Sequence, residues 1–254
     1  MIRIETIKKQ FDDQVVLKGI STVFEEGKTN LIIGKSGAGK TVMLKILVGL
    51  LQPTSGTVWY GDTDFTALNN KQRKAIRTDM GMLFQGSALF DSMTVEENVR
   101  FPLDMFTNLT WDEKKKKVNE TLDRVELTGS NNKYPSEVSG GMQKRVGIAR
   151  AIILDPKFLF CDEPNSGLDP TTSMKIDKLI RSITVENKMT TVINTHDMNS
   201  VMEIGDNINL LHLGELAWVG NCKEVMTSEN QMLQDFIFAS PFLQRLRDAA
   251  NSKQ

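Results

Sequence analysis

Cysteine is scarce in this chain of 254 residues. Its two cysteines, Cys161 and Cys222, cannot build a disulfide framework, and neither stands at metal-ligand spacing from a partner. No apolar run approaches the roughly 20 residues that cross a bilayer, and the opening segment Met1–Lys9 lacks the apolar stretch of a signal peptide. We therefore expect a reduced, cytoplasmic protein that meets a membrane only through a partner.

An excess of charge of either sign is also missing, because 31 Lys and Arg face 32 Asp and Glu. The formal net charge of −1 argues against bulk binding of nucleic acid, which usually requires a strong basic excess. The hydrophobic fraction of 40% and charged fraction of 25% are those of an ordinary globular protein. The length suits one large or two small domains.

One glycine-rich loop stands out. It fits the phosphate-cradling pattern G-x-x-x-x-G-K-[ST], with the residues Gly34, Lys35, Ser36, Gly37, Ala38, Gly39, Lys40 and Thr41. An apolar strand, Thr29–Ile33, precedes it, and Thr41–Leu51 follows with helical apolar spacing. Backbone N–H groups, the helix dipole and Lys40 would together hold the β- and γ-phosphates of a nucleotide.

The other elements alternate in the way that favours a parallel sheet flanked by helices. We expect strands at Ile2–Lys8, Val15–Phe24, Thr57–Tyr60, Met80–Phe84, Lys157–Cys161, Thr190–Asn194 and Asn207–Leu213. Helices are expected at Thr94–Arg100, Asp112–Glu126, Gly141–Leu154 and Thr171–Asn187. The pattern predicts a sheet core interrupted by a helical insertion at about 87–156.

Two acids follow the apolar strand that ends at Cys161. Ligands collect at the carboxyl ends of strands in open α/β sheets, and ATP hydrolysis needs a held magnesium ion and an oriented water. Thr41 would supply an oxygen ligand to Mg²⁺ and Asp162 would hold the metal through water. Glu163 would polarise the attacking water. The alternative, solvent-exposed acids at a strand end, is weak because a phosphate-binding loop lies upstream.

These segments resemble the ABC (ATP-binding cassette) ATPase family, and the resemblance covers nearly the whole chain. Asp162-Glu163-Pro164 resembles its Walker B segment, and Ser166-Gly167-Leu168-Asp169 its D-loop. Ser139-Gly140-Gly141-Met142 resembles its signature. Gln85 matches the Q-loop glutamine and His196 the switch histidine, in the order and at the spacing of the family.

The resemblance implies a RecA-like P-loop NTPase core with an N-terminal antiparallel β portion and an inserted helical subdomain. It implies an Mg²⁺-dependent ATPase in which Lys40, Glu163, His196 and Gln85 serve catalysis, with Gln85 also at the metal. It places the ABC ATPase domain at 1–225 and leaves a C-terminal helical extension at 226–254.

The signature segment precedes a helix, so its backbone amides would face an anion. No arginine is obviously placed to complete the nucleotide site within one chain. The resemblance implies a head-to-tail homodimer in which Ser139, Gly140 and Gly141 of one copy cap the γ-phosphate on the other, with Asp169 at the same nucleotide. An ordinary helix with a serine N-cap remains an alternative.

Two aromatic or imidazole side chains extend the expected site. Phe11 stands where the family stacks an aromatic ring on adenine, with core packing as an equal alternative. His196 would sense the γ-phosphate from the end of a strand. His212 and Cys161 are expected to be structural.

The chain also resembles one subfamily, the ATPases of Mla/Mce-associated ABC transporters, which move phospholipids or other lipids between the membranes of diderm bacteria. The likeness rests on the signature with Met142 and on the segment from Gln85 through Val95 and Glu97-Asn98-Val99 to Phe101-Pro102-Leu103. It implies a permease at the inner membrane, this chain on its cytoplasmic face, a periplasmic Mce-type lipid-binding protein and room for a small regulatory subunit.

An apolar cluster follows Gln85 and comprises Ala88, Leu89, Phe90 and Met93. We expect Ala88–Met93 to contribute a groove that receives a cytoplasmic helix of the permease, with core packing as the alternative. In the C-terminal extension, Met232, Leu233, Phe236 and Ile237 form one amphipathic face and Phe242, Leu243 and Leu246 a second. These faces either fold back on the core or contact a dimer partner or regulator.

The sequence therefore predicts an ATPase that dimerises on ATP and drives a membrane permease in lipid trafficking, without nucleic acid. Three alternatives remain: a soluble ABC scaffold such as one for iron–sulfur cluster assembly, the ATPase of a non-lipid importer, and a P-loop kinase. The kinase leaves Ser139–Met142 unexplained.

Overall fold

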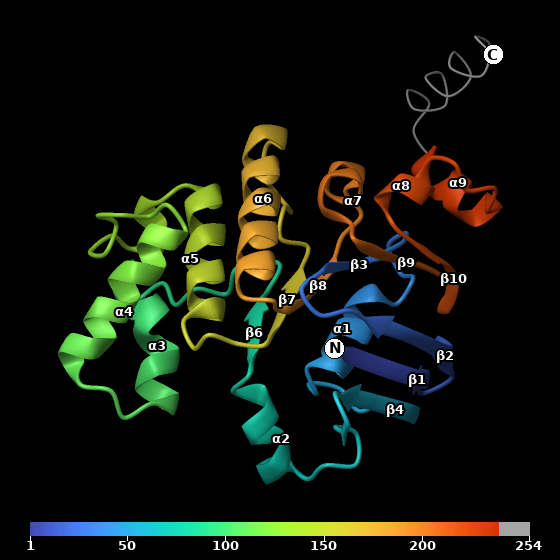
Figure 1. Ribbon diagram of the computed structural model, residues 1–254, viewed down its shortest axis with the longest axis horizontal. Helices are drawn as coiled ribbons and strands as arrows, with labels where there is room; N and C mark the ends of the chain where they lie inside the picture. Colours follow the sequence, from blue (N-terminus) through green and yellow to red (C-terminus); the bar gives the residue numbers. More distant parts are fainter. Residues whose placement is uncertain (239–254) are drawn as a thin grey trace.

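Two sheets organise the chain, whose residues 1–238 the computed structural model describes (Figure 1). The smaller sheet is antiparallel, in the order β2-β1-β4-β5. Its strands are β1 (Ile2–Phe11), β2 (Gln14–Phe24), β4 (Ser55–Tyr60) and β5 (Thr63–Asp64). This is the antiparallel portion expected at the N-terminus.

The larger sheet has six strands in the order β10-β9-β3-β8-β7-β6. They are β3 (Thr29–Ile33), β6 (Met80–Leu83), β7 (Phe158–Asp162), β8 (Thr190–Asn194), β9 (Asn207–His212) and β10 (Glu215–Gly220). All neighbours pair in parallel except β10, which is antiparallel to β9. Every residue of β3 and β8 is buried, as in parallel sheets covered on both faces.

Helix α1 (Lys40–Leu47) lies between the two sheets. Its Met43 and Leu44 belong to one buried cluster with Ile4 of β1 and with Phe160 and Val192 of the larger sheet. Because burial of apolar side chains is the main favourable term in folding, this cluster fixes the helix that follows the glycine-rich loop.

The opposite face of the larger sheet is covered by α6 (Pro170–Glu186) and α7 (Met198–Ile204). Their Ile180 and Val201 join a second cluster with Leu159 and Ile193, which we call the main cluster. Between β6 and β7 the chain forms a group of helices to one side of the sheets (Figure 1). They are α3 (Val95–Phe106), α4 (Trp111–Arg124), the 3₁₀ turn η1 (Pro135–Glu137) and α5 (Gly140–Ile152). The RecA-like core, the antiparallel portion and the helical insertion expected from the sequence are thus confirmed.

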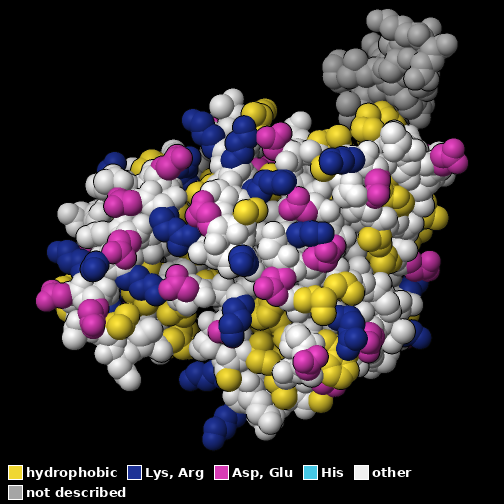
Figure 2. Space-filling model, in the orientation of Figure 1, with side chains coloured by type: hydrophobic (Ala, Val, Ile, Leu, Met, Phe, Trp, Pro, Cys, Tyr) yellow, Lys and Arg dark blue, Asp and Glu magenta, His cyan; other side chains and the backbone are white. Residues whose placement is uncertain are grey.

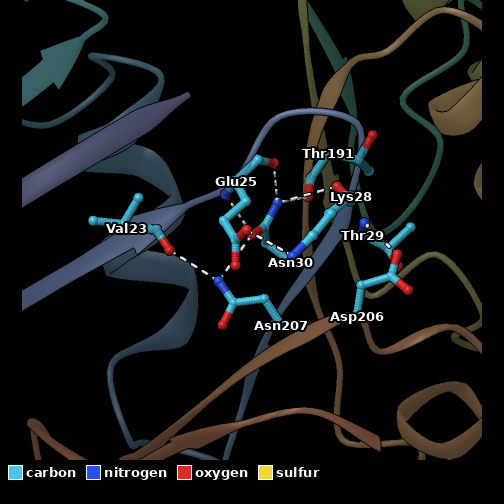
Figure 3. A network of polar contacts seen from close by, with 8 residues as sticks. All are labelled: Val23, Glu25, Lys28, Thr29, Asn30, Thr191, Asp206 and Asn207. Atoms are coloured by element: carbon cyan, nitrogen blue, oxygen red, sulfur yellow. Dashed lines mark hydrogen bonds and ion pairs between the residues drawn. The ribbon is translucent and has the colours of Figure 1, made fainter.

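A buried amide ties the connection between β2 and β3 to the larger sheet (Figure 3). Asn30 is fully buried; its Nδ2 donates to the carbonyl oxygens of Glu25 (2.9 Å) and Thr191 (3.1 Å). Its Oδ1 accepts from the Glu25 N–H (2.7 Å) and from Asn207 Nδ2 (3.0 Å). Since a buried polar group left unpaired costs about 1–3 kcal/mol, this network holds the start of β3 in place.

Some helices and strands were not predicted from the sequence. Helix α2 (Asn70–Arg77) has no apolar stripe, because Arg73 is its only buried residue. The short elements β5, α7, β10 and α8 (Cys222–Val225) were likewise not predicted. Helix α3 continues past the expected end at Arg100 and contains Pro102.

The C-terminal extension begins with α9 (Gln231–Ile237), in which Leu233 and Ile237 are buried and Met232 is 48% exposed. The first predicted face therefore folds back on the core at least in part; Phe242, Leu243 and Leu246 lie outside the described residues. Within residues 1–238, no helix combines the length and the apolar character needed to cross a membrane. On the face seen in Figure 2, acidic and basic side chains are interspersed.

Candidate nucleotide site

The glycine-rich loop connects the end of β3 to α1 in a conformation that requires glycine. Gly34 has φ +146°, and a Cβ atom there would lie 2.3 Å from the carbonyl oxygen of Leu211. Gly39, the residue before α1, has φ +102°. Because side chains rarely adopt such backbone conformations, these glycines allow the loop to curl tightly over the N-terminus of the helix.

Lys40 lies inside this curl. Its Nζ donates to the carbonyl oxygens of Gly34 (2.8 Å) and Lys35 (3.3 Å), and the residue is 8% exposed. Burial lowers the pKa of Lys40, while the carboxylates of Glu163 and Asp162 oppose that shift. A desolvated ammonium held by loop carbonyls is placed to exchange them for phosphate oxygens.

Asp162 ends β7 next to the first turn of α1. Its Oδ1 lies 3.4 Å from Thr41 Oγ1 and accepts a hydrogen bond from Asn194 Nδ2 (3.1 Å) at the end of β8. Hydroxyl and carboxylate oxygens suit Mg²⁺, which keeps several waters and binds through few protein ligands. Residues 1–238 contain no group of three or more His, Cys, Asp or Glu that could hold a metal ion by themselves. The donor set fits a magnesium ion shared with nucleotide phosphates.

Glu163 and His196 are brought together from two strand ends. His196 Nδ1 lies 2.8 Å from Glu163 Oε2, with the glutamate side chain 14% and the histidine side chain 68% exposed. Glu163 has φ +50°, and its N–H donates to the carbonyl of Asn194 (3.0 Å). A strained residue that carries a carboxylate into a cavity is a common feature of functional sites.

Several of these groups face one cavity of about 750 Å³, whereas Asp162 is not among its wall residues. Its walls include most of the predicted loop together with Gln85, Glu163 and His196, the loop residues being Lys35, Ser36, Gly37, Gly39, Lys40 and Thr41. Gln85 Nε2 also donates to Ser166 Oγ across a long 3.5 Å contact. The structure thus joins segments that are far apart in the sequence around one cavity large enough for a nucleotide.

The predicted signature and Asp169 do not line this cavity. Ser139 caps α5, accepting from the Met142 N–H (3.3 Å), and Asp169 caps α6, accepting from the Thr172 N–H (3.0 Å). Hydrogen bonds from Thr172 lower the pKa of Asp169. Ser139 and Gly140 are exposed. Both capped helix ends therefore remain open to a second molecule.

Phe11 also lies outside the cavity walls. Its ring is 40% exposed and carries Lys9 Nζ 4.7 Å from its centroid, so the core-packing alternative is wrong. Cys161 is fully buried as expected, and burial raises the pKa of its thiol.

The segment Ala88–Met93 splits between core and surface. Leu89 packs against the main cluster, whereas Ala88 is exposed and Phe90 is 40% exposed. Phe90 stacks obliquely with Phe101, 4.9 Å between ring centroids. These rings border a groove of about 440 Å³, whose further apolar walls include Phe84, Pro102, Phe106 and Leu154. We refer to it as the aromatic groove.

Two cations of α5 hold the loop between the nucleotide cavity and the aromatic groove. Lys144 Nζ donates to the carbonyl oxygen of Gln85. Arg150 donates to the carbonyl oxygens of Ser87 (2.6 Å) and Ala88 (2.8 Å). The sequence analysis missed these contacts and that of Asn194 with Asp162, since no local pattern marks a side chain that binds a distant backbone.

Comparison with known proteins agrees with this geometry. The family model described as ABC transporter matches residues 17–166. The chain is 36% identical over 236 residues to the probable ribonucleotide transport ATP-binding protein mkl of Mycobacterium leprae, covering 93% of this chain and 68% of that protein. It is 39% identical over 241 residues to the methionine import ATP-binding protein MetN of Clostridium tetani, covering 93% and 74%.

Solved structures give the same result. The ATP-binding cassette MJ0796, described as a dimer in a post-hydrolysis state bound to ADP and Pi, superimposes with a TM-score of 0.79 at 31% identity, covering 87% of this chain and 99% of that one. The cbiO1 protein of Clostridium perfringens, described as part of the ABC transporter complex cbiONQ, gives a TM-score of 0.84 at 29% identity, covering 97% and 98%. The chain therefore belongs to the ABC transporter family, in which it is an ATP-binding cassette that hydrolyses ATP.

Proposed function

We propose that this chain is the ATPase subunit of a membrane transporter and works as a homodimer on the cytoplasmic side of a permease. The observation that carries the proposal is the aromatic groove, which is built on the loop that leaves the nucleotide cavity at Gln85. Exposed aromatic side chains that border a groove are typical of sites that receive a partner helix. Relatives described as an importer ATPase and as part of a transporter complex support the same proposal.

Within the cavity, Lys40 would neutralise the phosphates and Thr41, Asp162 and Gln85 would hold Mg²⁺. When bound there, the metal would supply positive charge against the charge that develops on the phosphates. Glu163 would accept a proton from the attacking water, and His196, 2.8 Å from that carboxylate, would orient it and contact the γ-phosphate. Phe11, exposed near the start of the chain, would stack on adenine.

The incomplete cavity supports dimerisation. The N-terminus of α5, formed by Ser139, Gly140 and Gly141, is not part of the wall of its own chain's cavity. These residues would therefore cap the γ-phosphate bound by another copy. Asp169 would join the same interface. A solved relative described as dimeric with ADP and Pi supports this arrangement.

The proposal also concerns the class of molecule that the transporter moves. The Met142 signature and the segment that begins at Gln85 favour phospholipid trafficking at an inner membrane, with an Mce-type lipid-binding protein and a regulatory subunit as further partners. A second candidate, import of a small polar solute, is favoured by the relatives' names, which specify ribonucleotide transport and methionine import.

The test is affinity purification of the Glu163→Gln variant from its native membranes with ATP and Mg²⁺, followed by mass spectrometry of proteins and lipids. Recovery of a polytopic permease with an Mce-type protein and phospholipid supports the lipid proposal. A permease with a solute-binding protein instead supports the importer. A complex without any membrane protein would contradict the transporter proposal itself.

A further inference from the structure

Three buried polar side chains from three elements meet behind the nucleotide cavity. Asp177 of α6 is 2% exposed, Ser200 of α7 is 1% exposed, and Asn165, in the loop after β7, is 9% exposed. Asp177 Oδ1 accepts from Asn165 Nδ2 (2.8 Å), and Asp177 Oδ2 accepts from Ser200 Oγ (2.8 Å). Asn165 Nδ2 also donates to Ser200 Oγ (3.0 Å). The three side chains close a triangle of hydrogen bonds, which we call the buried triad.

The triad joins the two segments that carry the facing carboxylate and imidazole. Asn165 follows Glu163-Pro164, and Ser200 lies in the helix that starts just after His196-Asp197. Asp177 belongs to neither segment but bonds to both. Asp177 lies on the long helix α6, which packs in the main cluster through Ile176 and Ile180. Both segments are therefore bonded to the same firmly packed helix.

The orientation of Asn165 depends on Asp177. The amide oxygen of Asn165 is buried and has no hydrogen-bond partner within residues 1–238. Turning the amide over would bring that oxygen against the carboxylate of Asp177, where two acceptors would face each other. The carboxylate therefore selects one orientation of the side chain.

The triad is also costly to bury, which argues against a role in packing alone. Burial raises the pKa of Asp177 to about 6 even though Ser200 and Asn165 donate hydrogen bonds to it. An apolar side chain of similar volume would avoid this desolvation. A carboxylate at this position is explained if its directional hydrogen bonds fix the loop that carries Asn165 relative to the helix that carries Ser200.

We propose that Asp177 is a positioning residue for ATP hydrolysis. Through Asn165 it holds the loop that follows Glu163, and through Ser200 it holds helix α7, which follows His196. Together these contacts set the position of the Glu163 side chain relative to that of His196. The inference rests on the roles proposed above for Glu163 and His196. It makes α6 a part of the hydrolytic apparatus although no atom of Asp177 lines the nucleotide cavity.

The test uses the full chain and three variants. Two are the single substitutions Asp177→Ala and Asn165→Asp. The third is a double variant that combines Asn165→Asp and Asp177→Asn. Since a small misplacement of reacting groups can reduce the rate by about 10²-fold, we expect kcat to fall by about 10- to 100-fold in the first two. The affinity for ATP should stay near that of the wild type. The double variant exchanges carboxylate and amide, keeps a donor facing an acceptor, and should recover most of kcat.

Glu186→Gln is the matched control, because Glu186 is an acid on α6 outside the triad, with a side chain 58% exposed and paired with Arg124 (3.7 Å); its kcat should be unchanged. Folding is checked by thermal melting. If Asp177→Ala does not fold, the comparison of kcat between the double variant and Asn165→Asp still tests the proposal. Wild-type kcat in Asn165→Asp, or a double variant no faster than Asn165→Asp, overturns the inference. Glu163→Gln and His196→Ala are assayed alongside: wild-type turnover in both would instead overturn the roles proposed for those residues.

Discussion

At the scale of single residues, the chemistry of the cavity depends on how Glu163 is held. The residue has a left-handed backbone conformation, and its N–H is fixed by the carbonyl of Asn194. Its carboxylate therefore points to His196, 2.8 Å away, and into the space that the nucleotide phosphates would fill. Removing the charge of Glu163 alone should therefore lower the rate of ATP hydrolysis.

Glu163→Gln should bind ATP as the wild type does but hydrolyse it about 10²- to 10⁴-fold more slowly, which is the usual contribution of a general base. The measurement pairs single-turnover release of phosphate with equilibrium binding of ATP. Glu120→Gln, on the surface of α4 with a side chain 61% exposed, is the control. Turnover near that of the control would sink the assignment of Glu163.

Asp177 should make folding stability depend on pH. Burial raises its pKa from 3.8 to about 6, with the acids Asp197 and Glu203 adding to the shift. Between these values the folded state binds a proton that the unfolded state has released, so this contribution to stability falls as pH rises. It is present in full below about pH 4 and lost above about pH 6.

The measurement is the free energy of unfolding in denaturant across that range for the wild type and Asp177→Asn. The wild type should lose stability relative to the variant between about pH 4 and pH 6, because asparagine cannot ionise. Exposed Asp62→Asn serves as the reference substitution. A constant difference between wild type and Asp177→Asn would contradict the shifted pKa.

At the scale of elements, the helical insertion is linked to the nucleotide cavity by backbone contacts. Lys144 and Arg150, both on α5, bind carbonyl oxygens of the loop from Gln85 to Ala88. The same loop forms a wall of the aromatic groove. One helix thus contacts this loop both at the nucleotide cavity and at the aromatic groove.

Phe90→Asp should abolish association with the permease and leave nucleotide binding intact. The ring is 40% exposed and lies at the groove, so its loss removes little core packing. Leu89, although adjacent, packs against the main cluster and is unsuitable for this experiment, since a charge there would also unfold the protein.

The readout is the fraction of chain that sediments with native membranes, together with the melting temperature. Leu213→Asp is the control, because Leu213 is 69% exposed and has φ +48°, a conformation that Asp tolerates. Membrane association of Phe90→Asp equal to that of the control would show that the groove is not the docking site.

At the scale of the whole molecule, we propose that one copy holds halves of two different nucleotide sites. The cavity lies beside the glycine-rich loop, whereas the open N-terminus of α5 lies outside it. A helix N-terminus attracts anions through its free N–H groups and its dipole. Two copies in head-to-tail arrangement would bring each N-terminus to the other copy's phosphates.

Gly140→Asp should prevent ATP-dependent dimerisation in the Glu163→Gln background. An acid in the first turn suits α5 itself, and an added Cβ meets only Leu168 at 3.6 Å, so the fold is kept. The new charge would repel the γ-phosphate of the other copy. Light scattering with and without ATP and Mg²⁺ gives the mass of the species.

Gly140→Ala is the matched control and should still dimerise. ATP binding by Gly140→Asp should equal that of the parent, which separates a failed interface from a failed pocket. A stable ATP-dependent dimer of Gly140→Asp would argue against a phosphate at this helix end.

The sequence by itself determined the features that contiguous residues encode. The loop from Gly34 to Thr41 needs only its own glycines and lysine, and an apolar strand followed by Asp162 and Glu163 places acids at a sheet edge wherever the strand lies. Long amphipathic segments such as that of α4, which buries Val118, Thr121 and Leu122 on one face, were predicted for the same reason. Helix α2 was not, because its stability does not rest on an apolar stripe.

Only the tertiary structure decided which of two neighbouring or equivalent residues faces the solvent. It exposed Phe11 and Phe90 and packed Leu89 against the main cluster. It also brought Glu163 to His196 and joined Asn165 to Asp177 and Ser200. These outcomes depend on side chains packed from distant parts of the chain. Local propensity and periodicity carry no record of such partners, whereas close packing of the folded chain selects them.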